Sequence, residues 1–243
     1  MIGVLAGFLG SLLGVGGGSV ITPVLVALGY DIKQVIPASL LSIVGTSLGG
    51  LDIYHREGLV DYRTGIRLEA TTVLGSLIGV HTALLLEPRM LKAALSLVLI
   101  YIAASMLRKI RQANEEEHGS EMSYTRRQLL GNVAAVFKGF MSALVGIGGG
   151  ILGVPILHRI MGLDMKRSIA TSKFLVGVTA AAGVLGYIMK GALDPCLGIS
   201  LSLGTIVGGI VGSMVGVRLS NKTSSIVFAL FLLVMSIVII LRG

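Results

Sequence analysis

The sequence predicts an all-α integral membrane protein in which two four-segment repeats pack as one bundle, and three observations support this. Of the 243 residues, 53% are hydrophobic and 13% are charged, with a mean hydropathy of +0.90. A soluble domain has about 25% charged residues, so there are too few charges here to cover a water-facing surface. Apolar runs of membrane-spanning length, roughly 20 residues, recur along the chain, and one stretch of sequence occurs twice.

The composition also limits the partners of the chain. The net charge is +8, but the basic residues lie between apolar segments, which indicates membrane topology and not nucleic-acid binding. The single cysteine, Cys196, excludes an internal disulfide and a cysteine metal cage, and we expect no cofactor. Residues 1–13 lack the basic start and cleavage site of a signal peptide, so we expect them to belong to the mature structure.

The repeated stretch covers most of each half of the chain. Residues 7–18 are GFLGSLLGVGGG, and residues 139–150 are GFMSALVGIGGG. Repeats of this kind are typical of secondary transporters, whose site lies between the halves. The pairing continues downstream, with one inserted residue, through Pro23 and Pro155, Gly29 and Gly162, Asp31 and Asp164, Lys33 and Lys166, Ser39 and Ser172, Tyr54 and Tyr187, Gly58 and Gly191, Asp61 and Asp194, Gly75 and Gly208, and Gly79 and Gly212.

Each half is predicted to contain four apolar segments. We expect membrane repeat 1 at 1–107, a polar cytoplasmic linker at 108–128, and membrane repeat 2 at 129–243. The linker is rich in charge and has no apolar stripe, so we interpret it as solvated; a regulatory role is the alternative. The expected segments are 2–28, 35–54, 65–86 and 90–107, then 129–160, 168–189, 197–219 and 223–241.

The first segment of each half contains a Gly-x-Gly-Gly-Gly motif, with Pro23 or Pro155 five residues after its last glycine. Successive glycines break a helix and permit positive φ. About 11 residues precede the first motif and about 10 follow it, so each piece spans only about 15 Å. That length is half of a bilayer, and such a segment either crosses as a broken helix or folds back as a re-entrant hairpin.

The charges of the loops distinguish these two arrangements. If all eight segments cross, lysine and arginine divide almost evenly between the two sides. If the first and fifth segments fold back, most of these residues lie on one side, as the positive-inside rule requires. We therefore predict three crossing helices and one re-entrant segment in each half. Three is an odd number, so the two halves are expected to be inverted.

The two glycine motifs are the predicted binding site. Irregular backbone at membrane depth is tolerated only where protein or water satisfies it, so close helix packing is one explanation. The other is that the helices starting after Gly18 and Gly150 direct N–H groups and positive dipole ends at a midplane anion. The occurrence of the motif in both halves favours the second explanation.

Lys173 is the predicted source of positive charge at this site. It lies beside Thr171 and Ser172 near the start of an apolar helix, where an ammonium must snorkel, pair, or face water. Snorkelling to the interface and completing an anion site are both open. The predicted substrate-binding residues are Gly16, Gly17, Gly18, Ser39, Gly148, Gly149, Gly150, Thr171, Ser172 and Lys173.

Other polar or small residues receive less specific interpretations. We expect Arg67 and Glu69 to anchor a helix at the interface, with a proton relay as the alternative. His81 is interpreted as a structural histidine, with pH sensing as the alternative. Cys196 lacks a basic neighbour and is expected to be inert. Glycines at every fourth position of the seventh segment predict close helix packing, within the bundle or between protomers.

The paired motif G-F-x(3)-L-x-G-x-G-G-G, followed by Pro and by A-S or T-S at the next helix, resembles the sulfite exporter TauE/SafE family. The resemblance covers nearly the full chain and includes Gly16 to Gly18, Ser39 and Gly148 to Gly150. It implies a small multi-pass carrier in the cell membrane for sulfur-containing or other small organic anions, driven by ion gradients. Ala38 stands where the second half has Thr171, so the first half lacks that hydroxyl.

The sequence thus predicts a secondary anion transporter that is not an enzyme. Its expected partners are a small anionic substrate and the lipid bilayer, with a proton or sodium ion as the candidate for coupling and a homodimer as an open option. A passive anion channel is the main alternative. An intramembrane enzyme or a membrane scaffold is less well supported, because no catalytic motif lies in a segment and a scaffold needs no midplane glycine breaks.

Overall fold

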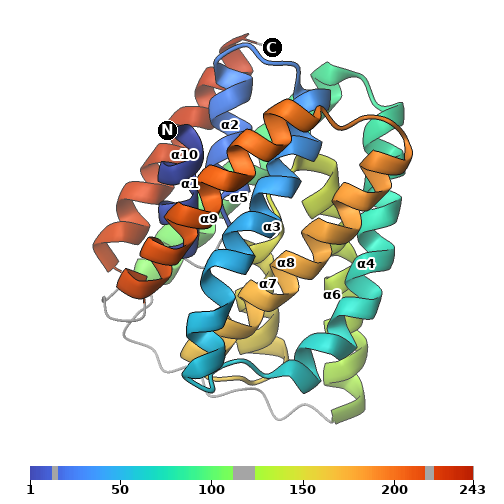
Figure 1. The fold of residues 1–243 in the computed structure, drawn as a ribbon. Helices are drawn as coiled ribbons and strands as arrows, with labels where there is room; N and C mark the ends of the chain where they lie inside the picture. The colour runs from blue at the N-terminus through green and yellow to red at the C-terminus, as the bar shows by residue number, and fades with distance from the viewer. Residues whose placement is uncertain (13–15, 112–123, 217–221, 243) are drawn as a thin grey trace.

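The structure is a computed structural model that describes residues 1–12, 16–111, 124–216 and 222–242. Within these ranges every element is a helix, and the helices form one elongated bundle (Figure 1). The elements are α1 (Ile2–Leu12), α2 (Gly18–Ala27), α3 (Ile32–Arg56), α4 (Tyr62–Leu85), α5 (Pro88–Arg111), α6 (Tyr124–Val145), α7 (Gly150–Pro155), the π-helix η1 (Ile156–Ile160), α8 (Met165–Met189), α9 (Pro195–Gly216) and α10 (Lys222–Arg242).

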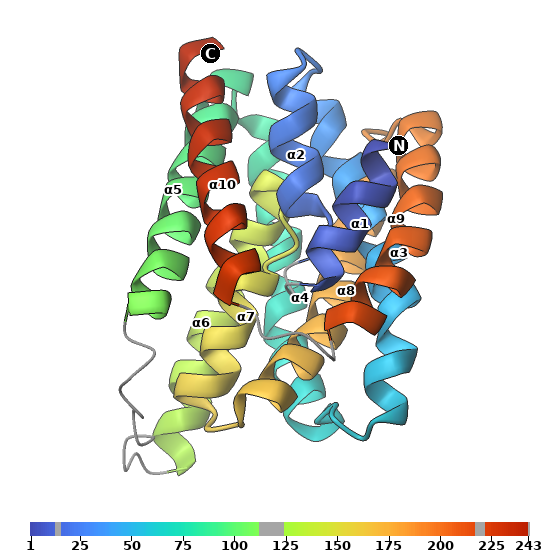
Figure 2. The same ribbon diagram turned by 90° about the vertical axis from the view of Figure 1, so that its left-hand side faces the viewer.

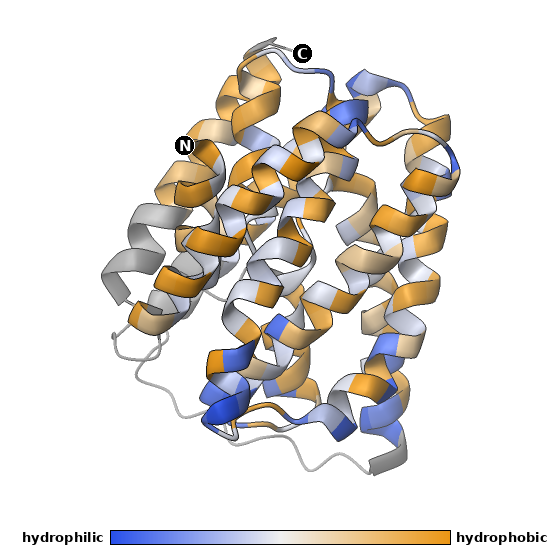
Figure 3. Ribbon diagram, in the orientation of Figure 1, coloured by the Kyte–Doolittle hydropathy of each residue, from blue (hydrophilic) through white to orange (hydrophobic). Residues whose placement is uncertain are grey.

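Among the described residues, six helices are long and apolar enough to cross a membrane. They are α3, α4, α6, α8, α9 and the Pro88–Ser105 part of α5, whereas α1, α2 and Ala229–Leu241 are shorter apolar helices. Hydrophobic residues lie along the length of the bundle and hydrophilic residues gather towards its ends (Figure 3). This pattern confirms the predicted multi-pass helical membrane protein.

Both glycine motifs interrupt their segments, and at each interruption the chain reverses direction. In Figure 2, α1 enters the bundle from its upper end and α2 returns to that end. By contrast, α6 rises from the lower end and α7 returns to it. The two broken segments are therefore hairpins that enter from opposite ends of the bundle.

The hairpins differ in length, which corrects one expectation. The first has two short arms, as predicted. The second was expected at 129–160 with two half-length pieces, but α6 begins at Tyr124 and is long enough to span a membrane by itself. Helices α5 and α6 also extend into the range expected for the linker, and its residues 112–123 lie outside the described part of the chain.

The turns between helices use the same residues in both halves. Glycines with positive φ follow α2, α3, η1 and α8, where a left-handed residue ends a helix most easily. An aspartate then caps the next helix by accepting backbone N–H bonds, as Asp31 does from Lys33 and Asp164 does from Arg167. These glycines are Gly29, Gly58, Gly162 and Gly191.

The predicted glycine stripes pack inside the bundle. In α9, a Cβ on Gly204, Gly208 or Gly212 would meet the backbone of α1. In α4, Gly75 and Gly79 approach the backbone of α6 just as closely. Small residues permit this backbone contact in a membrane, so each hairpin is fixed against a crossing helix of the other half.

Candidate functional site

The two glycine breaks meet in the interior of the bundle. A Cβ on Gly18 would lie 2.6 Å from the carbonyl oxygen of Gly146, so the two breaks are in direct contact. Ile43 of α3 and Val176 of α8 pack against both breaks. The sequence placed the breaks in corresponding positions of the two halves, and the structure brings them together.

In both breaks a new helix starts at the last glycine of the motif. Helix α2 begins at Gly18 with Gly17 as its N-cap, and α7 begins at Gly150 with Gly149 as its N-cap. Their conformations differ, because Gly17 is right-handed with φ −62° and Gly149 is left-handed with φ 63°. The glycines just before these N-caps, Gly16 and Gly148, have φ 85° and 81°, which only glycine adopts readily.

Ser39 connects the two breaks, as a site residue should. Its hydroxyl donates to the Gly146 carbonyl at 2.8 Å and accepts a hydrogen bond from the Thr22 hydroxyl at 2.9 Å. Thr22 also lies 3.0 Å from the same carbonyl oxygen. All three residues are buried. Thr22 was not predicted, because a threonine one residue before Pro23 has no distinctive sequence signal.

The structure separates Ser172 from Thr171. Ser172 donates to the Gly150 carbonyl at 3.1 Å and faces Gly153, so it lies at the second break as predicted. Thr171 instead accepts a hydrogen bond from the backbone N–H of Asp61 at 2.9 Å, at the start of α4. Thr171 therefore supports a helix connection and does not lie with the other predicted site residues.

Lys173 is buried at the first break, with 4% of its surface exposed. Its Nζ donates to the Ser11 hydroxyl at 2.7 Å and to the Ser213 hydroxyl at 2.5 Å, and it lies 5.2 Å from the centre of the Tyr54 ring. Gly50 provides the space for this ammonium. The snorkelling interpretation is therefore wrong.

Among the residues that the structure describes, no carboxylate forms an ion pair with Lys173. Its hydrogen-bond partners are neutral hydroxyls from α1 and α9. An uncompensated ammonium in a membrane interior is costly, and an anion bound at the first break would offset that cost. Ser11 and Ser213 were not predicted, because serines are frequent in membrane helices.

The second break has its own buried lysine, which the sequence analysis missed. Lys138 of α6 is 1% exposed, and its aliphatic stem passes 3.0 Å from the position of a Cβ on Gly149. Glu69 of α4 is 5% exposed and accepts a hydrogen bond from Thr179 at 2.7 Å. The prediction that Glu69 anchors α4 at the interface is wrong, although Arg67 is exposed there.

Two further predicted residues lie away from the breaks. His81 is exposed on α4. Cys196 is a free, exposed cysteine at the start of α9. Within the described residues, no group of histidine, cysteine or acidic side chains could hold a metal ion.

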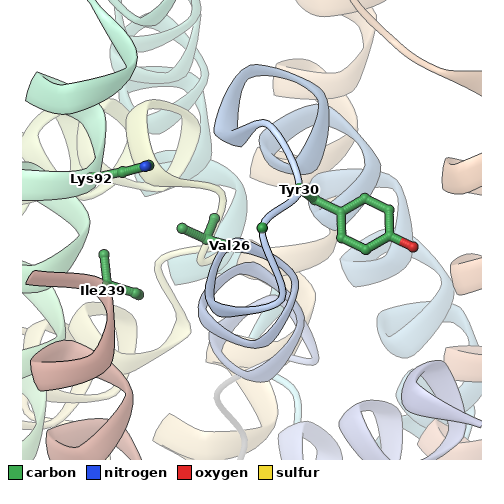
Figure 4. Close-up of a pocket in the computed structure, with 5 residues that line it drawn as sticks. Val26, Tyr30, Lys92 and Ile239 are labelled. Carbon is green, nitrogen blue, oxygen red and sulfur yellow. The ribbon is translucent and has the colours of Figure 1, made fainter. Parts of the chain in front are cut away.

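A pocket of about 310 Å³ lies at the end of the bundle, away from the breaks. It is bounded by Val26 and Tyr30 at the end of α2, Lys92 of α5 and Ile239 of α10 (Figure 4). The glycines of both motifs, by contrast, are buried where the structure describes them. The breaks are thus closed to both ends of the bundle in this structure.

Sequence comparisons with known proteins cover nearly the whole chain. Residues 1–239 match the family described as Sulfite exporter TauE/SafE. The probable membrane transporter protein YunE of Bacillus subtilis is 27% identical over 263 residues, which cover 100% of this chain and 94% of that protein. A probable membrane transporter protein of Haemophilus influenzae is 29% identical over 217 residues, covering 85% of this chain and 78% of that protein.

A plant protein shares part of the sequence. The Sulfite exporter TauE/SafE family protein 5 of Arabidopsis thaliana is 26% identical over 115 residues, which cover 42% of this chain and 26% of that protein. No solved structure gives a significant match.

Proposed function

Because the chain belongs to the sulfite exporter TauE/SafE family, we propose that it carries a small sulfur-containing anion, such as sulfite or a sulfonate, by alternating access. The protein is a multi-pass membrane transporter of the cell membrane. The anion would be held near the middle of the membrane, between the two halves, where the glycine breaks meet.

The observation that carries this proposal is the environment of Lys173. Its ammonium is buried and bonded only to neutral hydroxyls in the described residues. Burying a charge without a counter-charge is unfavourable, and a bound anion would remove that cost. The Ser11 and Ser213 hydroxyls beside the ammonium could also donate hydrogen bonds to an anion.

The closed breaks favour a carrier over a passive channel. A channel needs a continuous polar path, whereas here Gly18 and Gly146 touch and Ile43 and Val176 pack over the breaks. In a carrier, such contact corresponds to a state in which neither side has access. Movement of each hairpin together with the crossing helix on which it packs would open the breaks to one side and then to the other.

The proposed inversion of the two halves has support from the helix contacts. The hairpin helix α1 packs on α9, and the hairpin helix α6 packs on α4. In the repeat alignment, α1 corresponds to α6 and α9 corresponds to α4, so these two contacts are equivalent. The contacts of α3 with α8 and of α5 with α10 each join two corresponding helices. Inverted repeats of this kind are a common basis for alternating access.

The test is binding and flux with the purified protein. Liposomes containing it should take up labelled sulfite, thiosulfate or a sulfonate faster than empty liposomes. Lys173→Met should weaken anion affinity by roughly 1.5–3 kcal/mol, the net value of a hydrogen bond to a charged group, and Lys173→Arg should weaken it less.

The matched control is Lys190→Met, which removes an exposed lysine just after the end of the same helix. That variant should bind as the original protein does. If Lys173→Met also binds unchanged, Lys173 is not part of the site. If the original protein neither binds nor moves any of these anions, the proposed substrate class is wrong.

A further inference from the structure

The second break contains a buried acid and a buried base in addition to the groups around Lys173. Glu69 lies on α4 and Lys138 on α6, and the two helices pack closely through Gly75 and Gly139. The two charges attract one another. Among the residues that the structure describes, neither the Lys138 Nζ nor the Glu69 Oε2 has a hydrogen-bond partner, so the pair is not joined by a direct hydrogen bond.

A third unpartnered group lies on the same helix face. The hydroxyl of Ser142, one turn beyond Lys138 on α6, is buried and also lacks a hydrogen-bond partner within the described part of the chain. Buried polar atoms nearly always have partners, and those without one call for a functional explanation. Three such atoms, the Lys138 ammonium among them, lie on the facing helices α4 and α6, which makes this cluster a candidate site.

Among the described residues on the helices around Glu69, Lys138 is the charged group that faces its carboxylate. From α8, Thr179 donates to the carboxylate, and Tyr187 donates to the Ala143 carbonyl. Lys173, also on α8, is directed to Ser11 and Ser213. On η1, the ring of His158 bonds to the Leu163 carbonyl and Arg159 is exposed. The stem of Lys138 leads from the pair to Gly149 and Gly153 of the second break.

We propose that Glu69 binds the proton whose movement is coupled to the anion, and that Lys138 connects the two events. The proposal rests on the proposed anion transport and deepens it. When the Glu69 carboxylate takes up a proton from the side to which the site is open, it becomes neutral. The ammonium of Lys138 then has no counter-charge and attracts an anion to the second break. Release of the anion favours release of the proton, so one monovalent anion and one proton move together.

Linkage makes this proposal measurable, because protonation and anion binding must strengthen each other equally. The probe is methanesulfonate, whose charge does not change in the working pH range. Its affinity for the original protein should rise as the pH falls, by up to tenfold per pH unit. Glu69→Gln, which keeps the size of the side chain, should bind with the affinity of the acidic limit at every pH.

Flux gives the second measurement. Glu69→Gln should still exchange labelled for unlabelled methanesulfonate across liposomes, but a pH gradient should no longer drive its accumulation. Lys138→Met should lose the pH dependence and bind weakly throughout. If Glu69→Gln retains the original pH dependence and proton-driven accumulation, or if a sodium gradient drives accumulation instead, the proposal is wrong.

Proton uptake by the unmodified protein tests the proposal without any variant. When methanesulfonate is added to the purified protein in weak buffer above neutral pH, the protein should take up as much as one proton per anion bound. Binding without proton uptake would overturn the role of Glu69 and leave the anion site intact. If the proposed anion site is wrong, the results differ: methanesulfonate does not bind at any pH, or Lys173→Met binds it normally.

Discussion

The two glycine breaks share a backbone motif but differ in their charges. At the first break, Lys173 reaches from the other half and bonds to two serine hydroxyls. At the second, Lys138 comes from the same hairpin, and its nearby charge is the carboxylate of Glu69. The first break therefore has an uncompensated cation, and the second has an acid–base pair that is neutral as a whole.

This difference shows that the duplication conserved the turns and not the charges. The repeat partner of Lys173 is Leu40, and the GFxxxL register pairs Lys138 with Ala6. Both buried lysines belong to the second half, whereas the buried carboxylate belongs to the first. Two halves of related sequence can thus supply similar turns and different charges, as the proposed coupling of an anion to a proton would require.

The largest expected effect comes from filling the breaks. Gly17→Leu and Gly149→Leu should both abolish transport, since neither break has space for a branched side chain. Gly149→Leu should also destabilise the protein more, by about 1–2 kcal/mol, because only Gly149 is left-handed. Thermal unfolding in detergent compares the two variants. Equal losses of stability would show that the backbone difference between the breaks has no energetic consequence.

A smaller effect should follow from crowding Lys173. A Cβ on Gly50 would overlap the Lys173 Nζ and the Ser213 hydroxyl, so Gly50→Ala should displace the ammonium. We expect about tenfold weaker anion binding, equivalent to about 1.4 kcal/mol. Gly186→Ala is the control, because its Cβ would meet only methyl groups of Val80 and Leu77. Unchanged affinity in Gly50→Ala would mean that the position of Lys173 is not important for binding.

The serines of the two breaks should respond in opposite directions. Ser213→Ala removes a hydrogen bond to a buried charge and should lower the free energy of unfolding by roughly 1.5 kcal/mol. Ser142→Ala removes a buried hydroxyl that has no partner, so it should be neutral or stabilise the protein by up to about 1 kcal/mol. A clear loss of stability in Ser142→Ala would indicate a partner for this hydroxyl and weaken the contrast.

Labelling should leave activity unchanged and tests only the orientation of the halves. The native Cys196 is exposed near the start of α9, and we expect it to react with an impermeant reagent from outside the cell. Glu57→Cys, made together with Cys196→Ser, should react from the cytoplasmic side instead. Reaction of both positions from the same side would defeat the inverted arrangement.

Much of the fold could be predicted because composition and turn residues act locally. The low fraction of charged residues indicated the membrane, and the glycines and aspartates located the turns between helices. The start of α6 could not be located in this way, because Arg126 and Arg127 make its first turn look like linker.

The site was only partly predictable, because it depends on which way each side chain points. Thr171, Ser172 and Lys173 are consecutive, and consecutive residues of a helix point about 100° apart. They therefore reach three different places, and only two of these are glycine breaks. Lys138 could have been found with the argument used for Lys173, since both are cations within an expected apolar segment. Ser11 and Ser213 become visible only once α1 and α9 are packed together.

The glycine contacts between hairpins and crossing helices determine which parts of the molecule can move as units. Helix α1 is fixed to α9 from the opposite half, and α6 is fixed to α4 in the same manner. In the proposed alternating access, the parts that move as rigid bodies would therefore not coincide with the two sequence repeats. One body would contain α1, α3 and α9, the other would contain α4, α6 and α8, and the contact between α3 and α8 would be the hinge surface. Each body then contains helices from both repeats. A rocking motion would therefore move these mixed bodies relative to each other and would not move one repeat relative to the other.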